Sequence, residues 1–81
     1  MKPIAYTLSK AGTVTIDVTQ GETLIKSIKN NLVENPGDQS FQWDGADSSN
    51  QLVSIGDYQY KIIILDPYGL SKIFTGNIHI K

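Results

Sequence analysis

The chain has 81 residues, of which 40% are hydrophobic and 19% are charged, with a formal net charge of -1 and no cysteine. Such a length allows one domain with a thin core and little spare chain for a deep active-site cleft. The balanced charge makes nucleic acid and anionic membrane poor candidates as partners. The lack of cysteine excludes disulfides and thiolate chemistry. No apolar run approaches the ~20 residues of a membrane span, and none forms the apolar core of a signal peptide.

The first quarter of the chain alternates apolar and polar residues as β-strands do. Residues 3–8 form the first predicted strand, and its apolar face consists of Ile4, Tyr6 and Leu8. After a turn at residues 10–12, residues 13–19 form the clearest strand, because β-branched residues occupy both of its faces. The core positions predicted in this second strand are Val14, Ile16 and Val18.

The next segment has two interpretations. A turn at residues 19–22 favours a hairpin and a strand over residues 24–29. The apolar residues Leu24, Ile28 and Leu32 are spaced by four, which also suits a helix. We expect the strand, because the neighbouring segments favour hairpins. A loop over residues 30–39 is then predicted from its strong turn signal at residues 35–38.

The middle of the chain combines a short aromatic strand with a polar loop. Phe41 and Trp43 lie on one face of the strand predicted for residues 41–43. Residues 44–50 form the polar loop, and residues 51–54 are a brief extended stretch.

The last part of the chain predicts a long hairpin. Residues 58–65 form a strand, and its shared apolar face consists of Tyr58, Tyr60, Ile62 and Ile64. Further apolar residues at the end of this strand predict a central strand that is covered on both faces there. A proline turn at residues 66–69 leads to a last strand over residues 71–80, with a bulge at Gly76.

These segments amount to about seven short strands separated by turns, a pattern typical of an Ig-like sandwich. The predicted fold class is therefore all-β, an Ig-like or fibronectin-type-III-like antiparallel β-sandwich. We expect residues 1–81 to form a single module that is part of a larger protein.

The order of the motifs resembles the Ig-like domain of the flagellar hook-capping family, the FlgD-type module. The family pattern runs Ile-x-Tyr-x-Leu, Ala-Gly-x-Val-x-Ile, a glycine turn, Trp-Asp-Gly-x-Asp and Gly-x-Tyr-x-Tyr. The matching residues are Ile4, Tyr6, Leu8, Ala11, Gly12, Val14, Ile16, Gly21, Trp43, Asp44, Gly45, Asp47, Gly56, Tyr58 and Tyr60. The resemblance covers residues 3–64, and it implies a fibronectin-type-III-like sandwich with a structural role and no catalysis.

The resemblance implies one of two settings. Such modules occur in the hook cap, and also near the C-termini of large secreted or surface proteins, including hydrolases. A hook-capping protein typically has a flexible N-terminal segment and a Tudor-like insert, for which 81 residues leave no room. Residues 26–39 are also longer and less apolar than the family pattern. Both departures favour a generic surface module over the hook cap itself.

The polar loop of residues 44–50 has a structural and a metal-binding interpretation. Asp and Asn side chains stabilise turns by bonding their own backbone, and closely spaced oxygens can also bind calcium. The spacing does not fit an EF-hand loop, so we expect turn-forming residues. The calcium candidates in this loop are Asp44, Asp47 and Asn50.

The aromatic residues have a core and a sugar-binding interpretation. The residues concerned are Trp43, Phe41, Tyr58 and Tyr60. An Ig-like sandwich packs such rings at its centre, with a tyrosine hydroxyl bonded to a loop carbonyl, whereas exposed coplanar rings would bind carbohydrate. Tyr68 on the proline turn is a possible contact residue. The lone His79 is expected at the surface, because no carboxylate lies close to it in the sequence to complete a metal or catalytic site.

The sequence therefore predicts a non-catalytic structural or interaction module of a bacterial extracellular or cell-surface protein, acting as a spacer, stabiliser or assembly contact. Its expected partners are other proteins or neighbouring domains of the same chain, without nucleic acid, membrane insertion or a cofactor. The alternative is a carbohydrate-binding accessory module of a secreted hydrolase, with polysaccharide as the ligand.

Overall fold

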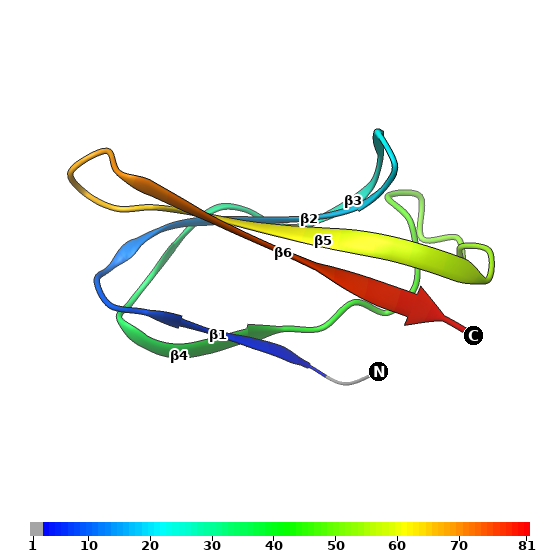
Figure 1. The fold of residues 1–81 in the computed structure, drawn as a ribbon, viewed down its shortest axis with the longest axis horizontal. Coiled ribbons are helices and arrows are strands. Elements are labelled where there is room, and N and C mark those ends of the chain that lie inside the picture. Colours follow the sequence, from blue (N-terminus) through cyan, green and yellow to red (C-terminus); the bar gives the residue numbers. More distant parts are fainter. Residues whose placement is uncertain (1–2) are drawn as a thin grey trace.

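Two antiparallel sheets face each other in the computed structural model, which describes residues 3–81 (Figure 1). The strands are β1 (Ile4–Leu8), β2 (Gly12–Gln20), β3 (Thr23–Glu34), β4 (Gly37–Phe41), β5 (Gly56–Leu65) and β6 (Ser71–Ile80). The larger sheet has the order β3-β2-β5-β6, and the smaller sheet consists of β1 and β4. This is the predicted all-β sandwich, although the described residues form six strands and not about seven. These residues include no helix that is long and apolar enough to cross a membrane.

β2 and β5 are the central strands of the larger sheet, and most of the residues on the inner face of each are buried. Val14, Ile16 and Val18 of β2 are fully buried. β2 pairs with β5 without interruption from Thr13, opposite Leu65, to Thr19, opposite Gln59. The alternation in the sequence is thus the alternation between the inner and outer faces of this sheet.

β3 is longer than the strand predicted for residues 24–29, because it continues along β2 to Glu34. β4 then begins at Gly37. The prediction of a loop over residues 30–39 is therefore wrong, and so is the helical interpretation of this segment.

A bulge explains why the pattern hid the second half of β3. Val14 pairs with Leu32 and Ile16 with Lys29, so two residues of β3 lie opposite the single residue Thr15. One of them, Asn31, has a φ of 51°, a left-handed conformation that Asn tolerates better than most residues. The extra residue shifts the alternation by one position, so the side chains that follow it in β3 point to the face opposite to the one that a period of two predicts.

Four smaller predictions also differ from the structure. Only Phe41 of the strand predicted for residues 41–43 belongs to β4, and residues 51–54 contribute a single bridge, between Ala46 and Leu52. Gly76 is not at a bulge, because it lies in regular register opposite Tyr60. The end of β5 is covered on its inner face alone: Leu65 on the outer face is exposed.

The core lies between the sheets in two adjoining clusters. The buried members of the first are Tyr6, Leu8, Val14, Ile16, Phe41, Ile62 and Ile64. The buried members of the second are Val18, Trp43, Tyr58 and Ile78. β1 and β4 have 5 residues each and β5 has 10, so the smaller sheet is too short to cover the whole sandwich. Trp43, just after β4, fills the remaining end.

Candidate interaction surface

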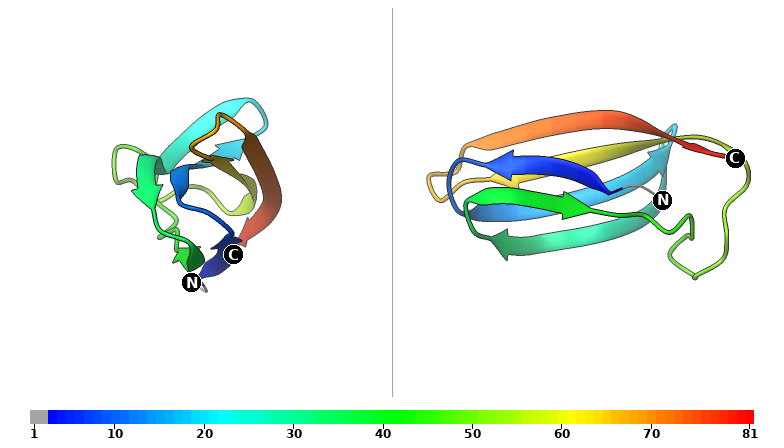
Figure 2. Two further views of the ribbon diagram at one scale, coloured as in Figure 1. Left: turned by 90° about the vertical axis from the view of Figure 1, so that its left-hand side faces the viewer. Right: turned by 90° about the horizontal axis from the view of Figure 1, so that it is seen from below.

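A groove runs between β1 and the inner face of β6, which we call the β1–β6 groove. It exists because the two strands of the smaller sheet leave β6 and part of β5 uncovered (Figure 2). A cavity of about 440 Å³ is lined by Thr7, Leu8, Ser9, Lys10, Ile64, Asp66, Leu70, Ser71, Lys72 and Phe74. A second cavity of about 420 Å³ is lined by Ala5, Tyr6, Thr7, Tyr60, Ile62, Phe74 and Thr75. Both are lined by Thr7 and Phe74, so they form one continuous groove.

The floor of the groove is apolar and partly exposed. Phe74 pairs with Ile62 across β5 and β6 and lies on the inner face, yet 47% of its surface is exposed. Ile78, on the same face of β6, is buried. The difference arises because no strand covers Phe74. Exposed apolar surface of this kind marks contact sites more often than scattered exposed residues do.

One wall of the groove is an unpaired strand edge. Within residues 3–81, β1 pairs with β4 alone. In an antiparallel strand, every second residue directs its N–H and C=O groups to the same side. Half of the β1 backbone groups are therefore directed away from β4 and toward the groove.

The mouth of the groove next to the β5–β6 turn is positively charged. Lys10 and Lys72 line it, together with the single carboxylate of Asp66. One oxygen of Asp66, Oδ1, accepts hydrogen bonds from the N–H groups of Tyr68 and Leu70, both at 2.9 Å, and so shapes the turn. Tyr68 is 78% exposed, and the Lys10 ammonium lies 5.2 Å from the centre of its ring.

The polar loop uses its carboxylates to hold its own backbone. Asp44 Oδ1 accepts a hydrogen bond from Ala46 N–H at 3.0 Å. Asp47 Oδ1 accepts bonds from the N–H groups of Ser49 at 2.9 Å and Gln51 at 3.0 Å. Asn50 has a left-handed φ of 64° and donates its N–H to the Asp47 carbonyl.

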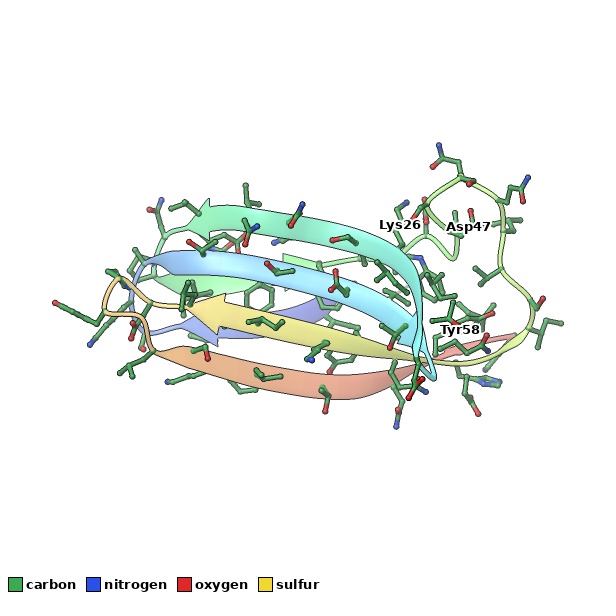
Figure 3. All side chains as sticks on the ribbon, turned by 90° about the horizontal axis from the view of Figure 1, so that it is seen from above. Lys26, Asp47 and Tyr58 are labelled. Atoms are coloured by element: carbon green, nitrogen blue, oxygen red, sulfur yellow. The ribbon has the colours of Figure 1, made fainter. Side chains whose placement is uncertain are left out.

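The loop projects beyond the end of the larger sheet, where Lys26 and Asp47 lie (Figure 3). Lys26 Nζ is 3.7 Å from Asp44 Oδ1. In the part of the chain that the structure describes, no group of three or more His, Cys, Asp or Glu residues is arranged to hold a metal ion. The geometry of Asp44, Asp47 and Asn50 is that of a hydrogen-bonded turn.

Three of the four predicted aromatic residues, Phe41, Trp43 and Tyr58, are buried between the sheets. Trp43 is 1% exposed, and its indole N–H donates to the Ala46 carbonyl at 2.8 Å. Its ring meets Tyr58 edge-on, with 5.2 Å between centroids. Phe41 is buried and meets the half-buried Tyr60 in the same way, at 5.5 Å. These rings do not form a planar exposed platform.

The hydroxyl of Tyr58 donates a 2.7 Å hydrogen bond to the Ser54 carbonyl, which is the tyrosine-to-loop bond that the sequence predicts. His79 is exposed at the end of β6, and its Nδ1 lies 2.6 Å from Asp57 Oδ1. Asp57 is exposed as well, so this pair lies on the surface, away from the groove.

Known proteins share this architecture. The family model described as the FlgD Ig-like domain matches residues 4–64. The chain belongs to the FlgD Ig-like domain family. The crystal structure of FlgD from P. aeruginosa has a similar fold, with a TM-score of 0.74 and 22% sequence identity, and the match covers 94% of this chain and 59% of that one. No curated protein is a significant match to the sequence.

Two of the motifs that carry the resemblance, residues 43–47 and residues 56–60, build one end of this domain. Trp43, Asp44 and Asp47 anchor and shape the polar loop. Tyr58 packs beneath it, on Trp43. Packing and hydrogen bonds within the turn thus hold these residues in place.

A buried polar network in this FlgD Ig-like domain was not predicted from the sequence. Tyr6 donates its hydroxyl to Glu34 Oε1. Lys29 Nζ donates to Glu34 Oε2 at 2.7 Å, to the Tyr6 hydroxyl at 2.8 Å and to the Ser40 carbonyl at 3.1 Å. The network joins β1, β3 and β4 along the side of the sandwich opposite the groove. The sequence offers only two charges as a signal: Lys29 at the end of the strand predicted for residues 24–29, and Glu34 within the loop predicted for residues 30–39.

The network has consequences for two pKa values. Burial raises the pKa of Tyr6, and the hydrogen bond to Glu34 raises it further, against the opposing effect of Lys29. Burial by itself lowers the pKa of Lys29, but the hydrogen bonds and charges of Glu34 and Tyr6 outweigh this and raise it. Lys29 is therefore held as a cation.

Proposed function

We propose that this FlgD Ig-like domain is a non-catalytic structural and interaction module of an exported bacterial protein, where it acts as a spacer, stabiliser or assembly contact. The proposal includes a location outside the cell or at its surface and a parent protein longer than 81 residues. Its partners are proteins or neighbouring domains of the same parent protein.

The observation that carries the proposal is the β1–β6 groove. It combines a partly exposed apolar floor around Phe74 with an unpaired strand edge, and both features suit contact with another polypeptide. The solved FlgD structure supports a module within a larger protein, because the match covers only 59% of that chain. Polysaccharide binding has less support, because Trp43, Phe41 and Tyr58 are buried.

The experiment that tests this proposal is deletion of the module from its parent protein in the natural host. We expect the parent protein to lose stability, attachment or assembly at the cell surface. As a matched control, an unrelated β-sandwich of similar size replaces the module: it should restore a spacer function but not an assembly contact. Unchanged stability, location and assembly after deletion would contradict the proposal.

A further inference from the structure

We propose that the β1–β6 groove binds an extended segment of a partner protein, which adds a third strand to the smaller sheet along the free edge of β1. This inference rests on the proposed function as an interaction module, and it specifies the chemistry of the partner. The bound segment pairs its backbone with β1 and directs alternate side chains onto the floor formed by Ile62, Ile64 and Phe74.

The backbone groups on the free edge of β1 favour a polypeptide as the bound partner. Its groove side presents N–H and C=O groups at the regular spacing of an antiparallel strand, because β1 pairs with β4 alone among residues 3–81. Only another extended backbone matches such a row of alternating donors and acceptors, and binding by strand addition uses this match. The 5 residues of β1 accommodate a strand of similar length, roughly 17 Å at about 3.4 Å per residue.

The floor of the groove selects apolar side chains at alternate positions. Side chains on one face of the added strand would lie over Phe74, which is 47% exposed, and over the neighbouring cavities of about 440 and 420 Å³. Covering Phe74 removes apolar surface from water, which favours binding. Aliphatic or β-branched residues suit both the strand conformation and the floor.

The charged mouth selects acidic residues at one end of the segment. Lys10 and Lys72 both line the cavity there, and the one carboxylate nearby, Asp66, already accepts two backbone hydrogen bonds. An Asp or Glu of the partner that reaches this end would meet two ammonium groups. Complementary charge of this kind fixes the direction of binding and raises the association rate.

The opposite side of the smaller sheet does not offer an equivalent site. There the Lys29 ammonium reaches from β3 to the Ser40 carbonyl of β4 and to Glu34, and so bridges the two sheets. Across the β1–β6 groove, the smaller sheet has no such polar bridge to β6 among the hydrogen bonds of the described residues. The groove is thus the open side of the sandwich.

The test uses the whole chain, labelled with ¹⁵N, and a synthetic peptide of alternating valine and threonine with two aspartates at one end. We expect shift changes and slowed amide exchange at alternate residues of β1, and shift changes around Phe74. Two N-methylated peptides provide the backbone control, since methylation blocks alternate sets of N–H groups. Methylation of the N–H groups that face β1 should weaken binding of the peptide about tenfold or more, and methylation of the other set should leave the affinity nearly unchanged.

Two substitutions on neighbouring positions of β6 provide the side-chain control. Phe74→Ser removes the floor of the groove, whereas Ile73→Ser changes a residue of similar exposure, 56%, on the outer face. Only Phe74→Ser should weaken binding of the peptide. If Phe74→Ser fails to fold, Lys10→Glu with Lys72→Glu replaces it: this double variant should prefer a peptide that ends in lysines over one that ends in aspartates.

The proposal is overturned by any of three results: no change at β1 at saturating peptide, equal effects of the two N-methylated peptides, or equal effects of the two β6 substitutions. Occupation of the groove by a second copy of the chain, seen as dimers by sedimentation that the peptide does not dissociate, would also overturn it. None of these results affects the deletion test of the proposed function, which measures assembly of the parent protein whichever surface is used.

Discussion

The ring of Tyr60 lies across Gly76 on the neighbouring strand. The two residues pair in the antiparallel register of β5 and β6, and a Cβ atom on Gly76 would come within 2.3 Å of Cζ and Oη of the tyrosine. A side chain at position 76 would therefore displace the ring of Tyr60. Its lack of a side chain lets the Tyr60 ring cover the strand and meet Phe41 edge-on, an arrangement in which an aromatic ring compensates for a glycine within a strand.

Replacement of Gly76 by alanine should destabilise the domain by about 1–3 kcal/mol, because the methyl group forces the ring of Tyr60 out of its position. Urea denaturation measures the change. In a Tyr60→Ala background the same substitution should cost less, since the clash is gone, and the difference gives the coupling between the two residues. An equal cost in both backgrounds would show that the ring does not set the requirement for glycine.

The sequence predicted the regular strands well, and the reason is physical. β2 and β5 each have one face against the core, so their apolar residues recur with a period of two. The second half of β3 could not be predicted, because the bulge opposite Thr15 breaks that period and because the charged residues Lys29 and Glu34 occupy buried or partly buried positions, where a strand pattern requires apolar residues.

The groove could not be predicted from the sequence. It depends on which strands form the smaller sheet, and β1 pairs with β4 across more than twenty intervening residues. Nothing in the pattern of residues 3–8 distinguishes a strand with two partners from a strand with one. Phe74 likewise has the pattern of a core residue in β6, and its exposure follows only from the narrow sheet opposite it.

Removal of the Lys29 charge should be costly, because Glu34 would remain buried without its cation. We expect Lys29→Met to destabilise the domain by about 2–4 kcal/mol. Lys26→Met on the same strand is the matched control: its ion pair with Asp44 is 3.7 Å long and its carboxylate is exposed, so the substitution should cost less than about 1 kcal/mol. Similar urea midpoints for the two variants would contradict a structural role of the network.

Alkaline pH should destabilise the domain through the same network. The pKa values of Tyr6 and Lys29 are raised in the folded chain above their ordinary values of 10.0 and 10.5. The folded state therefore holds these protons more tightly than the unfolded state. The resulting stability is fully present below about pH 10 and is lost as the pH rises through the raised folded pKa values.

The measurement is the urea midpoint between pH 8 and pH 11. Other tyrosines and lysines also titrate in this range, so the comparison is with the double variant Tyr6→Phe and Lys29→Met. This variant should lose a smaller part of its stability on the alkaline side. Parallel pH profiles for the two proteins would place the alkaline sensitivity elsewhere.

Asp47 distinguishes the turn and calcium interpretations of the polar loop. Its Oδ1 accepts two backbone N–H groups, so Asp47→Ala should cost about 1 kcal/mol, and Asp47→Asn, which keeps an acceptor oxygen, should cost less. The melting temperature of the unmodified chain should be the same in calcium and in a chelator, because a turn held by its own backbone gains nothing from the ion. A calcium site would instead raise the melting temperature with ion concentration, and that rise would disappear in Asp47→Ala.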